Sequence, residues 1–133
     1  TTAEPISLSG AGNLTIQNSR IESTESGGTV INIANSWSGQ LIAKNCEIVA
    51  TTVTTNEATT GILYGTGVTG DVQLKDCTII TAQDGTGTAQ SITTTATATA
   101  TVYIQGTLSQ THDVDSDITL AGGASITNTN FTA

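Results

Sequence analysis

Apolar and polar residues alternate in short runs, and these runs recur at a nearly constant interval along the chain. Four segments align without gaps on one pattern: a small residue, a polar residue, apolar–x–apolar, a polar residue, then Asn, Asp or Gly followed by Ser, Cys or Thr. The copies are GNLTIQNSRIE from Gly12, GQLIAKNCEIV from Gly39, GDVQLKDCTII from Gly70 and ATVYIQGTLSQ from Ala100. Their first apolar positions are Leu14, Leu41, Val72 and Val102, at spacings of 27, 31 and 30 residues, followed after 24 residues by Ile126 in a weaker fifth copy. Such self-similarity predicts a repeat architecture.

A second alternating strip precedes three of these copies, beginning eight residues before each one. Period-two alternation puts every second side chain on one face, and that face is apolar in each strip. In successive repeats it carries Ile31, Ile33, Trp37 and Leu41, then Ile62, Tyr64, Val68 and Val72, then Ile92, Ala96, Ala98 and Val102. This parity favours a core position for Trp37 over an exposed platform for stacking sugars. The polar or Gly-rich stretches 24–29, 51–61, 82–89 and 111–117 are predicted to be loops.

A repeat of this length holds two or three short strands and cannot bury its apolar face alone. Stacking equivalent positions closes a core and pairs each strand in parallel with its neighbours, about 4.8 Å away. Identical polar side chains then form ladders. We expect an Asn ladder through Asn18, Asn45, Asp76 and Asn130, broken at Gly106, and beside it a column of Ser19, Cys46, Cys77 and Thr107.

The h-x-h-x-N-C-x-I pattern with its Asn ladder resembles the right-handed parallel β-helix proteins. These include pectate lyases and related polysaccharide lyases, phage tailspikes and bacterial surface proteins. The resemblance covers residues 12–131 and implies an all-β fold, a right-handed parallel β-helix (a solenoid) of about five coils, without a capping helix. Residues 1–133 are expected to form one domain. A likeness of fold alone does not assign a function.

Charge and composition restrict the partners. The chain has 11 acidic residues against 3 basic ones, a net charge of −8, whereas nucleic acids and anionic membrane surfaces attract clustered Lys and Arg. No run of 18 apolar residues predicts a membrane span. The chain starts at Thr1 without an apolar leader and is rich in Thr, Ser and Asn. We therefore expect a mature or excised chain located outside the cell or on its surface.

Cys46 and Cys77 occupy the same position in adjacent repeats. Their Cα atoms should lie about 4.8 Å apart, inside the range of roughly 4.4–6.8 Å that a disulfide requires. The pair is therefore a disulfide candidate, and two buried thiols acting as small apolar side chains are the alternative. Two cysteines alone cannot form a tetrahedral zinc site, and the one histidine, His112, is far away in the sequence.

The densest group of ionisable residues is the segment HDVDSD. In an extended segment Asp113, Asp115 and Asp117 point the same way and offer three oxygen ligands to calcium, which is the only cofactor that the sequence suggests. A solvated acidic loop is the alternative interpretation.

The sequence gives little support for catalysis. No Ser–His–Asp arrangement exists, and the cysteines have no base nearby in the repeat register. Arg20 has Glu47 one repeat above it, which predicts a surface ion pair. Glu22 and Glu47 could approach the separation of a glycosidase pair, but so could many exposed carboxylates. We therefore predict that the chain is not an enzyme.

The function favoured by these patterns is structural. Neither end has an amphipathic helix, and uncovered strand rows associate with other strands. The subunits are thus expected to stack head to tail into an extracellular filament, as a homo-oligomer joined through Ile6, Leu8, Ile126, Asn130 and Phe131. The alternatives are a β-helix that binds or degrades carbohydrate through its side face, and a spacer fragment of an adhesin or passenger protein.

Overall fold

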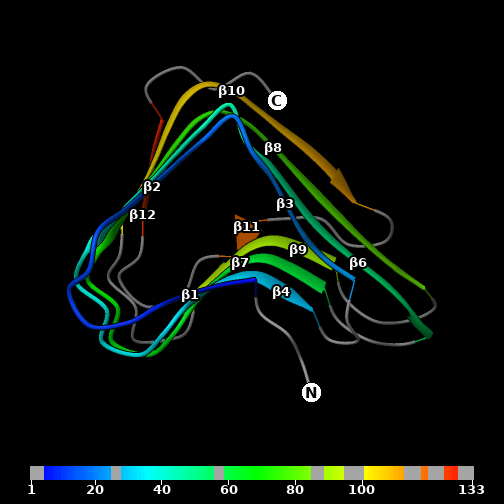
Figure 1. Ribbon diagram of the computed structural model, residues 1–133, viewed down its shortest axis with the longest axis horizontal. Coiled ribbons are helices and arrows are strands. Elements are labelled where there is room, and N and C mark those ends of the chain that lie inside the picture. Colours follow the sequence, from blue (N-terminus) through cyan, green and yellow to red (C-terminus); the bar gives the residue numbers. More distant parts are fainter. Residues whose placement is uncertain are drawn as a thin grey trace.

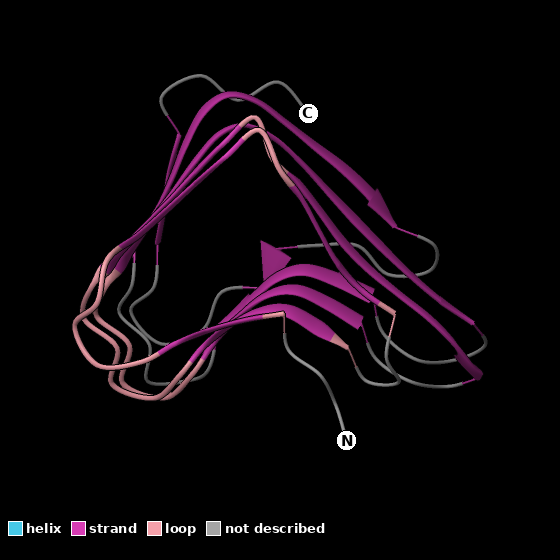
Figure 2. Cartoon of the chain, in the orientation of Figure 1, coloured by secondary structure: helices cyan, strands magenta, loops and turns pink. Residues whose placement is uncertain are grey.

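A computed structural model describes residues 5–24, 28–55, 59–84, 89–94, 101–112, 118–119 and 125–128. This part of the chain is all-β and contains no helix (Figure 2). Its strands are β1 (Ile6–Leu8), β2 (Leu14–Gln17), β3 (Arg20–Ser23), β4 (Thr29–Ile33), β5 (Gln40–Lys44), β6 (Glu47–Thr55), β7 (Thr59–Tyr64), β8 (Asp71–Asp84), β9 (Ala89–Thr94), β10 (Thr101–His112), β11 (Ile118–Thr119) and β12 (Ser125–Asn128). Consequently no described segment is a helix that could cross a membrane.

The strands form two sheets in which every pairing is parallel. One sheet has the order β1-β4-β7-β9-β11, and the other has the order β12-β10-β8-β5-β2, with β3 beside β6 and β6 beside β8. The chain therefore crosses from one sheet to the other and back within each repeat. Figure 1 shows the strands along three sides, with the first sheet on one side and the long strands β8 and β10 bending across the other two.

The first apolar position of each sequence copy lies in register with the next. Leu14 pairs with Leu41, Leu41 with Val72, Val72 with Val102, and Val102 with Ile126. The predicted repeat register is confirmed through all five of these positions. The spacing between repeats varies, but these paired positions stay in register. The differences in length therefore lie in the segments between the paired strands.

One column of the predicted alignment is wrong after the third copy. The register shifts by one residue between Gln105 and Leu108, so Leu108 rather than Thr107 pairs with Cys77. The fourth copy thus contains one extra residue at the corner, which is the definition of a β-bulge. Gly106 has no Cβ and therefore permits such an irregularity. An alignment without gaps cannot detect the extra residue.

Three predicted loops are shorter than expected because strands extend into them. β6 continues to Thr55, β8 to Asp84 and β10 to His112, and Thr55 lies in register with Asp84. These stretches are polar. The first, at residues 51–55, is rich in threonine, whose β-branched side chain favours strands, and the other two extend by pairing with a neighbouring level. Polarity alone therefore misplaced the strand ends.

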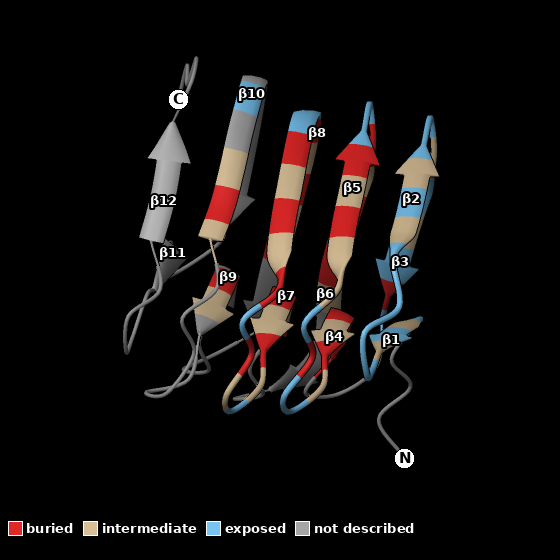
Figure 3. Ribbon diagram, turned by 90° about the vertical axis from the view of Figure 1, so that its left-hand side faces the viewer, coloured by how far each residue is buried: buried red, intermediate tan, exposed pale blue. Residues whose placement is uncertain are grey.

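The core consists of the inward-facing positions of the two sheets. Burial alternates along β5 and β8, as the banding in Figure 3 shows. The predicted apolar faces are buried wherever the structure describes them, including Trp37 at 0% exposure, which confirms its core position. Ala96 and Ala98 lie outside the described residues. The fully buried members of the two faces are Ile31, Ile33, Trp37, Leu41, Ile62, Tyr64, Val68, Val72, Ile92 and Val102.

The first row of strands is less buried than the rows behind it. In the described part of the chain β1, β2 and β3 each pair along one edge, with β4, β5 and β6 respectively. Their inward apolar side chains pack on the core but remain only half-buried. These side chains are Ile6, Leu8, Leu14, Ile16 and Ile21.

Candidate functional site

The site with the most polar chemistry lies at the corner where β2 turns into β3, β5 into β6, and β8 bends. One residue at each level has a left-handed backbone: Asn18 with φ 52°, Asn45 with φ 50° and Asp76 with φ 51°. A side chain with a Cβ is strained there, and Asn and Asp tolerate this conformation better than other residues. The corner therefore explains why the sequence repeats Asn or Asp at this position.

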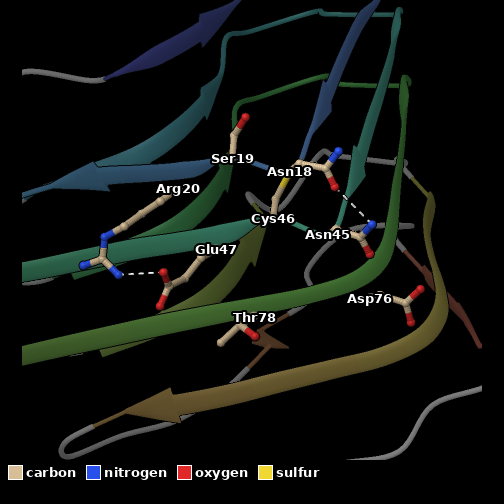
Figure 4. A pocket seen from close by; sticks show the side chains of 8 residues that line it. All are labelled: Asn18, Ser19, Arg20, Asn45, Cys46, Glu47, Asp76 and Thr78. Carbon is tan, nitrogen blue, oxygen red and sulfur yellow. Dashed lines mark hydrogen bonds and ion pairs between the residues drawn. The ribbon is translucent and has the colours of Figure 1, made fainter.

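The three corner residues form a column along the stack. The Asn45 side-chain amide donates a hydrogen bond to the Asn18 side-chain oxygen over 3.2 Å, as drawn in Figure 4. The backbone follows the same step, because the Asn18 N–H donates to the Lys44 carbonyl at 3.0 Å and the Asn45 N–H to the Lys75 carbonyl at 2.9 Å. Asn130, the remaining predicted ladder residue, lies outside the described residues.

Next to this column stand Ser19, Cys46 and Cys77. Both cysteines are buried free thiols, so the structure contains the dithiol form of the predicted pair. Ser19 occupies the equivalent place in the first repeat, where its hydroxyl donates to the Gln17 carbonyl at 2.8 Å. Burial is the main cause that raises the pKa of the Cys77 thiol above its usual value. A buried, protonated thiol is a poor nucleophile.

Charged side chains line the outer side of the corner. Arg20 forms ion pairs with Glu47 in the next repeat at 2.7 Å and with Glu22 at 3.2 Å, so the predicted pair across the repeats is confirmed. The hydrogen bonds that Arg20 donates to Glu47, and then those to Glu22, raise the pKa of Arg20. All three side chains are between 38% and 48% exposed, and such pairs stabilise a fold little. Both glutamates hold the same guanidinium, which is unlike an acid and base facing a substrate.

The three basic residues of the chain all belong to this corner. Lys44 and Lys75 precede Asn45 and Asp76 directly and pair in register with each other, while Arg20 follows Asn18 by two residues. The corner is therefore where the positive charge of an acidic chain gathers. Marking the charged residues on the aligned repeats would have predicted this cluster of basic residues from the sequence.

The same corner contains a shallow hollow of about 490 Å³ that is open to solvent (Figure 4). It offers amides, hydroxyls, a guanidinium and carboxylates, and no aromatic ring or histidine among its lining residues. The described residues contain no group of three or more His, Cys, Asp or Glu side chains placed to hold a metal ion. The predicted calcium ligands Asp113, Asp115 and Asp117 lie outside the described residues. The lining residues are Asn18, Ser19, Arg20, Asn45, Cys46, Glu47, Asp76 and Thr78.

A second corner, between the first sheet and β2, β5 or β8, was not predicted. Gly10, Ser36 and Gly67 have positive φ there, and the Trp37 indole N–H donates to the Gly12 carbonyl at 3.0 Å. Asn side chains again join successive levels: the Asn13 side-chain oxygen accepts from the Gln40 N–H at 2.8 Å. The contacts at this corner therefore join one level of the chain to the next.

Comparison with known proteins gives no relative. The chain matches no protein-family model, no curated protein and no solved structure. Its function must therefore be argued from its own geometry.

Proposed function

We propose that the chain is a right-handed parallel β-helix of about five coils that serves as a structural subunit at the cell surface or outside the cell, and that its copies stack head to tail into a filament. The observation that carries the proposal is the incompletely covered first strand row. Its apolar side chains are half-buried, and its strands pair along one edge in the described part of the chain.

The β-helical interpretation rests on the path of the chain. The chain passes from the first sheet to the second and back in each repeat, and each strand pairs in parallel with its equivalent one repeat away. Connections between parallel strands of one sheet are right-handed in about 98% of cases. A right-handed coil is therefore the hand to expect for each repeat.

The outer edge of β2 has backbone groups directed away from the molecule. The Asn18 N–H donates to Lys44 of β5. Because peptide groups alternate in direction along a strand, the N–H groups of Thr15 and Gln17 point away from β5, toward the edge of β2 that has no partner strand among the described residues. Exposed edges of this kind pair with other strands.

A second copy of the chain fits this edge because the other end of the stack repeats the same pattern. In β12, Ile126 holds the register position that Leu14 holds in β2, and β12 pairs with β10 along one edge in the described residues. A joint between β12 of one copy and β2 of the next would continue the parallel sheet. Ile6 and Leu8 in β1 would be covered by the same contact, whereas Asn130 and Phe131 lie outside the described residues. Because this contact joins unlike surfaces, it propagates instead of closing a dimer.

The experiment compares two substitutions at one exposed edge position. Thr15→Pro removes an outward N–H, and proline is tolerated on edge strands. Thr15→Val keeps the N–H and is the matched control. We expect the wild type and Thr15→Val to form filaments in negative stain, and Thr15→Pro to need about tenfold more protein for the same light scattering, equivalent to about 1.4 kcal/mol.

Salt provides an independent check on the same samples. The net charge of −8 opposes association, so assembly should strengthen as salt shortens the screening length to about 8 Å at 0.15 M. A wild type that stays monomeric at high concentration and moderate salt contradicts the proposal. So does Thr15→Pro assembling like Thr15→Val.

Carbohydrate binding is the second candidate, and the corner hollow is the observation that favours it. Its amide, guanidinium and carboxylate groups suit hydrogen bonds to sugar hydroxyls. It lacks the aromatic platform that commonly stacks on sugar rings. Discrete particles that retain a glycan in an array experiment, and lose it in Arg20→Ala, would favour this candidate over the filament.

A further inference from the structure

The two thiols have equivalent surroundings one repeat apart. The Cys46 sulfur lies 3.6 Å from the Ile16 carbonyl oxygen and 3.3 Å from that of Lys44. The Cys77 sulfur lies 3.4 Å from each of the two corresponding carbonyl oxygens, that of Ala43 in the preceding repeat and that of Lys75 in its own. Ile16 pairs with Ala43, and Lys44 pairs with Lys75. The two sulfurs are thus related by a step of one repeat along the stack.

That step fixes the distance between the sulfurs. Neighbouring strands are about 4.8 Å apart, so two side chains in the same orientation place their sulfurs about 4.8 Å apart. A disulfide needs about 2.05 Å. Zinc–thiolate bonds are about 2.3 Å long, so two thiolates that bind one ion of similar size in a line lie roughly 4.6 Å apart. The pair therefore suits a bridging ion better than a direct bond.

The number of protein ligands near the two thiols and the path from solvent to them indicate which class of ion fits the site. The described residues contain no third His, Cys, Asp or Glu with which the thiols could complete a tetrahedral site. Soft thiolates select Cu(I), and a d¹⁰ ion of this type is satisfied by two ligands in line. Cys46 lines the open corner hollow, which gives an ion a path from solvent. Four carbonyl oxygens near the sulfurs present partial negative charge that favours a cation.

We propose that Cys46 and Cys77 form a two-coordinate site for Cu(I). Each sulfur binds the ion through one electron pair, and both thiol protons leave to solvent. Copper remains Cu(I), so no oxidant or reductant takes part. Because binding releases two protons from buried thiols, the affinity rises with pH. The proposal rests on the repeat register and on the surroundings of the two sulfurs, and it is independent of filament formation.

The test uses the full chain, anaerobic Cu(I) and a competing Cu(I) chelator. Native mass spectrometry is expected to find one ion per chain, and the chelator competition to give at least a hundredfold weaker binding for Cys46→Ser and for Cys77→Ser. Serine is a matched replacement, because Ser19 already occupies this column in the first repeat. Circular dichroism of each variant verifies that it folds.

A register-shifted variant separates the site from the general reactivity of a thiol. Ser19→Cys combined with Cys77→Ser moves the pair by one repeat and keeps the same spacing. This double variant should regain binding of one ion per chain at an affinity within about tenfold of the wild type, since ligand type and geometry are retained. Two ions per chain in the wild type, single variants that bind as the wild type does, or a double variant without binding would each overturn the proposal.

Discussion

At the scale of single residues, the corner column shows how the backbone conformation at one position explains the residue type that the sequence repeats there. Asn18, Asn45 and Asp76 share one left-handed conformation, and the amides of the first two also bond to each other. The repeated Asn thus does two things: it tolerates the backbone, and it joins levels. These two contributions are separable, because glycine meets only the first requirement and alanine meets neither.

Replacing Asn45 by alanine or glycine measures the two contributions. Asn45→Ala should lower the free energy of unfolding by about 1–2 kcal/mol beyond the lost side-chain bond, because alanine is strained at φ 50°. Asn45→Gly should lose only the bond to Asn18, which is exposed and worth about 1 kcal/mol at most. Urea unfolding at neutral pH gives both values. Equal losses in the two variants would contradict a backbone role.

Tyr64 makes the stability depend on alkaline pH. Its side chain is fully buried, and its hydroxyl has no hydrogen-bond partner among the described residues. Burial raises the pKa of Tyr64 well above its usual value of 10.0, and the negative charge of Asp71 adds to this. Above about pH 10 the unfolded chain loses this proton while the folded chain keeps it, so stability falls as pH rises, by up to about 1.4 kcal/mol per pH unit.

Tyr64→Phe should remove this dependence. We expect the variant to be as stable as the wild type at pH 7 or about 1 kcal/mol more stable, since an unpaired buried hydroxyl is eliminated. The difference should widen in its favour from pH 10 to pH 11. Thermal unfolding followed by circular dichroism measures it, and Tyr103→Phe is the control for losing a phenol. A difference that does not change with pH would argue against the buried ionisation.

At the scale of elements, the start of β8 depends on close packing against the preceding repeat. A Cβ on Gly70 would lie 2.5 Å from the Trp37 ring and 2.5 Å from the Gly39 carbonyl oxygen. The equivalent glycine of the first repeat, Gly12, has open space, with its nearest neighbour 4.0 Å away. A Cβ on Gly39, the second-level glycine, would likewise meet the Gly12 carbonyl oxygen, so space requires glycine at the second and third levels but not at the first.

Gly70→Ala and Gly12→Ala test this difference between equivalent positions. The added methyl at Gly70 must displace a buried indole and backbone, which should cost about 1–3 kcal/mol. The same change at Gly12 should alter the stability by less than about 0.5 kcal/mol. Chemical denaturation of both variants provides the comparison. A similar loss in both would mean that the Trp37 contact is not the cause.

The strands and their register could be predicted from the sequence because period-two alternation and the repeat report on burial directly. The pairing of Leu14 with Leu41 and the burial of Trp37 followed in this way. The bulge after Gln105 could not be predicted, since one extra residue at a corner leaves the alternation on both sides intact. The strand ends at Thr55, Asp84 and His112 could not be predicted either, because pairing with a neighbouring level outweighs polarity there.

At the scale of the whole molecule, the stacking of the repeats decides which of the predicted site residues lie close together. Stacking brings Asn18, Asn45 and Asp76 together, and it aligns the two cysteines as free thiols. The sequence contained the positions of the two cysteines but not the side-chain directions, which decide whether the thiols can bond. The acidic segment 113–117 lies outside the described residues, so calcium binding there stays a prediction from the sequence.

The parallel register also has a consequence for how the chain reaches this structure. Each strand pairs with a partner about one repeat away, between 24 residues for Val102 with Ile126 and 31 for Leu41 with Val72. Closing a loop of that length costs about 3 kcal/mol of chain entropy before the first contact is made. No hairpin is available among the described strands to start locally. We therefore expect slow folding that begins at the best-packed levels, around Trp37, and then adds one level at a time at a similar entropic cost.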